Sequence, residues 1–80
     1  MTEWIVDLRP RVDRAGLSRV QQLLPALGPE DRLTLVFERE DAHQTGPVVR
    51  LLEKWGLGWQ PRGGHGELYF LHAGRHLPRA

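Results

Sequence analysis

Near the start of the chain, apolar and polar residues alternate with a period of two. Trp4, Val6 and Leu8 fall on one face, and Ile5 and Asp7 fall on the other. This alternation predicts a β-strand. The stretch RPRV at 9–12 ends the strand, because proline has no amide hydrogen to donate to a neighbouring strand.

From Asp13 the apolar positions take helical spacing. The Asp13 side chain can accept a hydrogen bond from an unpaired amide of a first helical turn. One apolar stripe follows, at Leu17, Val20, Leu23, Leu24 and Leu27. Pro25 interrupts this stripe, so we expect the regular helix to end near Leu24 and a looser turn to follow.

The middle of the chain predicts a second strand and a second helix. Residues 32–38 alternate and place Leu33, Leu35 and Phe37 inward, which is typical of a central strand. After a charged connection at 38–43, the sequence has good helix-start signals, with Thr45 or Gly46 as N-cap and Pro47 at the first helical position. The expected buried stripe of this helix is Val48, Leu51, Leu52 and Trp55, and Gly56 ends it.

The last third of the chain predicts two more strands, at 57–62 and 67–73. The glycine-rich turn at 63–66 permits the positive φ angles of a hairpin. The fourth strand is apolar on both faces, so its inward face is left open by the sequence. We expect residues 75–80 to form a flexible tail.

The element order is therefore β-α-β-α-β-β, in one domain that covers residues 1–80. Connections of the β-α-β type are parallel and right-handed, which places both helices on one face of the sheet. The closing hairpin is antiparallel. The sequence thus predicts a two-layer α/β sandwich with a mixed four-stranded sheet.

Composition and charge are those of an ordinary soluble domain. The chain is 40% hydrophobic and 26% charged, with a net charge of +1, so no overall field attracts nucleic acid or a membrane. It contains no cysteine, which excludes disulfides, thiolate metal sites and persulfide carriage. No apolar run approaches the ~20 residues that span a bilayer, and no segment resembles a signal peptide, so we expect a cytoplasmic location.

The element order and several short motifs resemble the TusA/SirA-like sulfur-carrier family. The stretch VDLR at 6–9 is similar to the family's opening motif, and LPALGPED at 24–31 resembles its helix end and following turn. The pairs at 40–41 and 55–56 resemble its acidic pair and its helix-ending glycine. The resemblance extends without gaps from Trp4 to Leu57, and it implies a TusA-like fold and a context of sulfur or redox metabolism.

The residues that carry the family's chemistry are absent from this chain. Counting from Asp7, the position of the sulfur-carrying cysteine is Asp13, and the two motif prolines fall on Arg14 and Gly16. Persulfide chemistry needs a thiolate, which an aspartate cannot supply. The resemblance therefore implies a divergent, cysteine-free member that keeps the fold and the position of a site but not the activity.

The candidate site is the basic loop and the start of the first helix. Arg9, Arg11 and Arg14 cluster beside Asp13, and both arginine and a helix N-terminus favour an anion or the carboxylates of a partner. The competing interpretation is a solvated loop in which Asp13 satisfies the helix amides and Arg9 pairs with Asp7.

Other chemistry has less support in the sequence. The histidines His43, His65, His72 and His76 match no compact zinc spacing, so we predict no metal and no cofactor. Nothing places a histidine beside Ser18, and the glycine-rich turn at 63–66 precedes a strand rather than a helix, so it is not a phosphate loop. We expect no catalytic residues and no enzyme activity.

The sheet face opposite the helices is the remaining candidate surface. We expect Ile5, Val36 and either Tyr69 or Leu71 to line it, and we expect nothing in this short chain to cover it. An exposed apolar patch of this kind is typical of a protein partner surface or a homodimer interface. The sequence therefore predicts a non-catalytic accessory or protein-interaction domain.

Two alternatives remain open. The first is an RNA-binding domain, because the same strand and helix order occurs in the C-terminal domain of the third translation initiation factor. Its phosphate contacts would come from Arg9, Arg11, Arg14, Arg62 and Arg75, although the low net charge argues against it. The second is a small-oxyanion-binding domain that uses the loop at 9–14.

Overall fold

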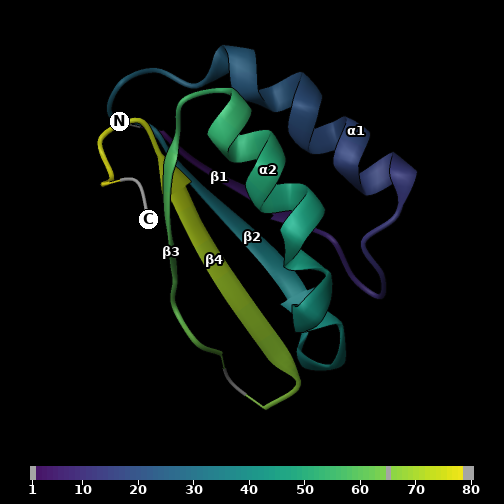
Figure 1. Cartoon of the computed structure of the whole chain (residues 1–80). Coiled ribbons are helices and arrows are strands. Elements are labelled where there is room, and N and C mark those ends of the chain that lie inside the picture. The colour runs from purple at the N-terminus through teal and green to yellow at the C-terminus, as the bar shows by residue number, and fades with distance from the viewer. Residues whose placement is uncertain (1, 65, 79–80) are drawn as a thin grey trace.

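A mixed sheet of four strands forms one layer of the structure (Figure 1). The structure is a computed structural model that describes residues 2–64 and 66–78, those at 42 and 43 without their side chains. Strands β1 and β2 are parallel, whereas β4 is antiparallel to both β2 and β3, which gives the order β1-β2-β4-β3. The strands are β1 (Glu3–Asp7), β2 (Arg32–Glu38), β3 (Gly58–Pro61) and β4 (Leu68–Gly74).

Two helices form the second layer and lie on the same face of the sheet (Figure 1). They are α1 (Arg14–Leu23), which is followed by the 3-10 turn η1 (Leu24–Ala26), and α2 (Gly46–Lys54), which is preceded by the 3-10 segment η2 (Arg39–Thr45). The predicted element order, the mixed four-stranded sheet, the placement of both helices on one face and the antiparallel closing hairpin are all confirmed.

The hydrophobic core lies between the sheet and the two helices. Leu33, Leu35 and Phe37 of β2 are completely buried. They belong to one cluster with Val20 of α1 and Leu52 of α2. Because side chains alternate along a strand, the residues between these three point to the opposite face of the sheet, which the helices leave uncovered. We call this second face the open face.

Both helices end where local sequence signals predict. The regular turns of α1 stop at Leu23, and Pro25 lies in η1. Helix α2 ends at Lys54, and Gly56, two residues later, has a φ of +75°. The amide of Gly56 donates to the Glu53 carbonyl and that of Leu57 to the Leu52 carbonyl, both at 3.0 Å. This pair of bonds satisfies carbonyl groups that a glycine-terminated helix would otherwise leave free.

The pairing of β4 shows which of its two apolar faces points into the core. Tyr69 pairs in register with Phe37, and the two rings pack with their centroids 6.0 Å apart. Leu71 pairs with Leu35 and is 1% exposed. The expectation that Tyr69 or Leu71 lines the open face is therefore wrong, because strand pairing places both in the core. Phe70 and its neighbour two residues before, Leu68, lie on the open face instead.

The connection after β2 and the segment from Arg75 onward have more structure than the sequence predicts. The connection after β2, expected as a charged loop, forms η2. The predicted tail begins at Arg75, whose guanidinium donates to the carbonyls of Leu27 and Trp55, both at 3.2 Å. Arg75 thus contacts the C-terminal ends of both helical segments. Flexibility of the tail stays a prediction, and residues 79–80 lie outside the described residues.

Candidate functional site

The first half of the β1–α1 loop is fixed by a salt bridge between neighbouring side chains. Asp7 accepts hydrogen bonds from Arg9 Nε at 2.9 Å and from Arg9 Nη2 at 2.7 Å. The Arg9 amide also donates to Asp7, at 2.9 Å. These hydrogen bonds from Arg9 lower the pKa of Asp7 from 3.8 to about 2. Arg9 is therefore partnered within the chain, which is the structural role that competed with anion binding.

The second half of the loop is fixed by two further carboxylates. Asp13 Oδ1 accepts from the Gly16 amide at 2.7 Å, so the predicted helix cap is confirmed. The Val12 amide donates to Asp41 Oδ2 at 2.9 Å, which connects the loop to η2. Side chains of the protein itself therefore occupy amides that an anion would need at this helix start.

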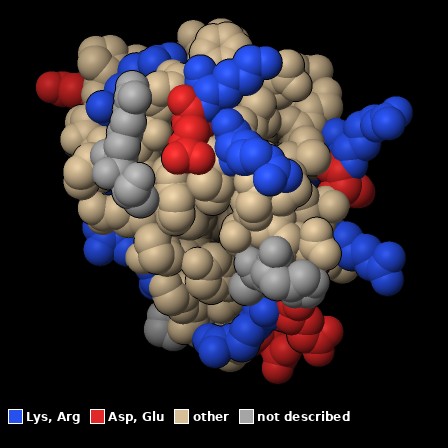
Figure 2. Space-filling view, viewed as in Figure 1, with Lys and Arg blue, Asp and Glu red and all other residues tan. Residues whose placement is uncertain are grey.

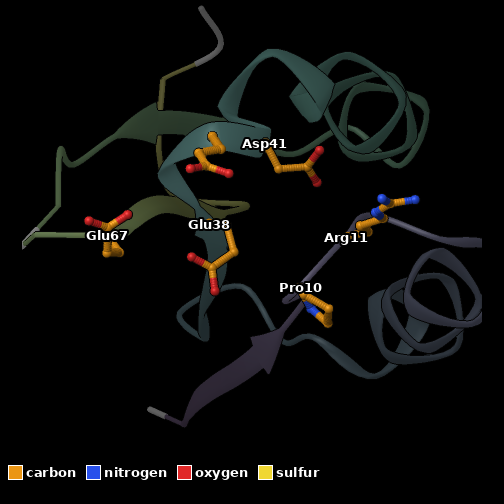
Figure 3. A pocket seen from close by; sticks show the side chains of 6 residues that line it. Pro10, Arg11, Glu38, Asp41 and Glu67 are labelled. Carbon is orange, nitrogen blue, oxygen red and sulfur yellow. The ribbon is translucent and has the colours of Figure 1, made fainter.

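An open hollow of about 410 Å³ lies beside this loop (Figure 3). It is found at the carboxyl ends of β1 and β2, the edge at which open α/β sheets commonly bind ligands. Figure 3 shows Glu38, Asp41 and Glu67 on one side of it and Arg11 and Pro10 on the other. The residues that line it are Pro10, Arg11, Glu38, Glu40, Asp41 and Glu67.

The lining of the hollow gives it an acidic character. Four carboxylates face a single guanidinium, so the local charge favours a cation over a small oxyanion. Within residues 2–64 and 66–78, however, no three histidine, cysteine, aspartate or glutamate side chains are grouped so that they could hold a metal ion. The hollow therefore supports neither the oxyanion alternative nor a metal site.

The four predicted site residues take four separate roles. Arg9 pairs with Asp7, Arg11 lines the hollow, Asp13 caps α1, and Arg14 is an exposed residue of the first helical turn. Sequence analysis did not identify Glu38 and Glu67 as hollow residues. They are far apart in the sequence and meet only because Glu38 ends β2 and Glu67 directly precedes β4, its antiparallel partner.

The arginines named for RNA binding are also dispersed. Arg75 donates to two helix-end carbonyls, and Arg62 follows β3 at the opposite edge of the sheet from β1. Figure 2 shows the helix-covered side, where basic side chains are spread out with acidic ones between them. Continuous phosphate binding needs a basic stripe, which this side does not present.

The open face carries an apolar patch around Ile5. Ile5 is 72% exposed, and it is the one exposed large hydrophobic side chain among the residues that the structure describes. Val36 and Phe70 pair directly on the neighbouring central strands and share this face, and Leu68 extends the patch along β4. Ile5 and Val36 therefore lie on the predicted face, but only Ile5 is exposed, because Val36 is buried with 8% of its surface accessible.

Comparison with models of protein families, with curated proteins and with solved structures gives no match to this chain. Among the described residues, no helix is both long enough and apolar enough to cross a membrane.

Proposed function

We propose that this chain is a non-catalytic interaction domain that binds a partner protein through its open face. The observation that carries the proposal is the 72% exposure of Ile5, which lies on the edge strand β1 of the open face. Burial of such a side chain contributes about 1.5–3 kcal/mol. Contact of a partner with Ile5 and the half-buried Phe70 would release this free energy, whereas the hollow and the loop offer no comparable apolar area.

The size of the open face favours a transient partner over a permanent homodimer. Its two longest strands, β2 and β4, each have 7 residues. Strands β1 and β3 have 5 and 4 residues, so with strands ~4.8 Å apart and a rise of ~3.4 Å per residue the four strands cover on the order of 380 Å². Stable interfaces bury about 800 Å² on each partner. A second copy of the chain is therefore the weaker candidate for this face.

We propose further that the domain is a divergent, cysteine-free relative of the TusA/SirA-like proteins with an accessory role in sulfur or redox metabolism. The element order supports this relationship, as does the location of Asp13 at the start of α1, where the family has its cysteine. A chain without a thiol cannot carry sulfur. Its contribution to such a pathway would be binding to another protein.

Site-specific photo-crosslinking in cells tests the proposed function. A benzophenone amino acid is placed at position 5 on the open face, and at position 21 on the exposed side of α1 as a matched control. We expect a discrete adduct of one mass from position 5 alone, and loss of this adduct when Phe70→Glu is added. Equal adducts from both positions, or none from position 5, would contradict the proposal. An adduct with the mass of two chains would assign the face to a homodimer.

A further inference from the structure

A row of polar side chains crosses the middle of the open face. Thr34, His72 and Gln60 are direct neighbours on β2, β4 and β3, and Ile5 continues the row on β1. Thr34, His72 and Gln60 are each half-buried. Across residues 2–64 and 66–78, none of these three side chains has a hydrogen bond to another group of the protein. Half-buried side chains of this kind are still reached by water, and a ligand that accepts hydrogen bonds can replace that water.

Two arginines flank this row on the same face. Arg32 precedes Thr34 by two residues on β2, and Arg62 is placed opposite Phe70, to whose carbonyl its amide donates at 3.0 Å. Both guanidinium groups lower the pKa of His72, so the imidazole has one cation nearby on β2 and another directly after β3. Arg32 also has an exposed contact with Glu3 at 3.4 Å, whereas Arg62 has no side-chain ion pair within residues 2–64 and 66–78. We call the row together with these two arginines the strip.

We propose that this strip binds a carboxylate from an acidic segment of the partner protein, whose apolar side chains pack on Ile5 and Phe70. The inference rests on the proposed function and names the chemistry of the partner. A carboxylate only accepts hydrogen bonds. The Thr34 hydroxyl and the Gln60 amide can donate to it, and the two arginines add charge-assisted attraction.

The apolar surroundings favour a protein segment over other anions. Ile5 and Phe70 offer contact area to the aliphatic side chains of a peptide, which an inorganic anion cannot use. The outer rim of the face also carries the carboxylates of Glu3 and Glu38, which repel the continuous charge of a nucleic-acid backbone. A partner segment in which acidic and apolar side chains alternate fits both the apolar residues and the charged residues of this face.

Occupation of the strip is coupled to the protonation of His72. The charged groups that face His72 are Arg62, which directly follows β3, Arg32 from β2 and, with opposite sign, Glu3 from β1. Burial, Arg62 and Arg32 hold the pKa of His72 below its usual value, so the free domain has a neutral imidazole near pH 7. A bound carboxylate raises this pKa, so binding takes up a proton and becomes tighter as the pH falls.

Titration of the complete, 15N-labelled chain with two defined peptides tests the inference. One peptide contains alternating pairs of leucine and glutamate, and the other has lysine in place of glutamate. We expect the glutamate peptide to shift the amides of Thr34, Gln60 and His72, to raise the pKa of His72, and to bind several-fold more tightly at pH 5.5 than at pH 7.5. Arg62→Gln should weaken binding about two- to five-fold, whereas Arg50→Gln on α2 should leave it unchanged.

Several results would overturn the inference. They are equal shifts with the lysine peptide, the same shifts with inorganic phosphate alone, an unchanged pKa of His72 at saturation, and no shift with millimolar glutamate peptide. The crosslinking experiment distinguishes failure of the proposed interaction domain from failure of the proposed acidic partner segment. If the adduct at position 5 persists in Arg62→Gln and His72→Gln but is lost in Phe70→Glu, the interaction domain stands and the acidic partner is excluded.

Discussion

The backbone amide of Val12 donates a hydrogen bond of 2.9 Å to the carboxylate of Asp41. The two residues belong to segments that follow neighbouring parallel strands, the loop after β1 and η2 after β2. This bond therefore holds the β1–α1 loop against η2 at the point where the two segments line the acidic hollow.

Removal of that acceptor should loosen the loop. Asp41→Ala leaves the Val12 amide without its partner, and we expect a loss of about 1 kcal/mol. For a domain of this size the melting temperature should fall by roughly 4–8 °C. Asp41→Asn keeps an acceptor oxygen and should lose less, and Glu40→Ala removes an adjacent exposed carboxylate as a control. Hydrogen exchange of the Val12 amide that is as slow in Asp41→Ala as in the parent chain would refute this role.

The salt bridge between Asp7 and Arg9 has a measurable signature in acid. Arg9→Gln should raise the pKa of Asp7 from about 2 toward 3.8, as followed by the carboxyl 13C shift. Because the folded pKa is depressed, the stabilisation is complete above the unfolded value and is lost as the pH falls through about 2. Arg11→Gln provides the matched control, since Arg11 lines the hollow instead. A shift of equal size in both variants would show that the effect is not specific to the Arg9 contact.

His72 should make stability fall with decreasing pH as Asp7 does, but in a higher pH range. Its pKa is lowered in the folded state, first by burial and then by Arg62 and Arg32. The unfolded chain therefore binds more protons over this range, so stability is complete above ~6.5 and decreases as the pH falls below it. We expect His72→Gln to reduce the fall in melting temperature between pH 7 and 5, and Arg62→Gln to raise the pKa of His72. Parallel melting curves for the parent chain and His72→Gln would disprove this assignment.

Gly58 should tolerate no side chain. A Cβ atom at this position would clash with the backbone carbonyls of Leu77 and Pro78, which cross the sheet there. Gly58→Ala should therefore destabilise the domain by about 1–3 kcal/mol. At Gly46 a Cβ meets nothing within 4 Å, so Gly46→Ala should be neutral or stabilising by about 0.4–1 kcal/mol. Equal melting temperatures for the two variants would mean that residues 77–78 do not stay against β3.

Features that depend on one helical turn or one strand period were predictable from the sequence. Asp13 caps the amide three residues ahead, and Pro25 and Gly56 act on the turn in which they lie. The alternation in β2 likewise identifies Leu33 and Leu35 as core residues without any knowledge of neighbouring strands.

Features that depend on pairing between distant strands were not predictable in this way. Both faces of β4 are apolar, and only its register against β2 places Tyr69 on Phe37. The same pairing creates the row of Thr34, His72 and Gln60, whose members are separated by long stretches of chain. Segment η2 was missed because its polar residues show no apolar period.

The location of β4 at the centre of the sheet has a consequence for biosynthesis. β4 is the last of the four strands to leave the ribosome, yet it separates β2 from β3 and pairs with both. Until it is made, β2 has a free edge, and the side chains of Leu35 and Phe37 lack their partners across the sheet. Exposed strand edges of this kind favour association with other chains. A translational pause within residues 58–67 would therefore prolong the stage at which the nascent domain is most prone to aggregate, and synonymous codons there should influence its yield.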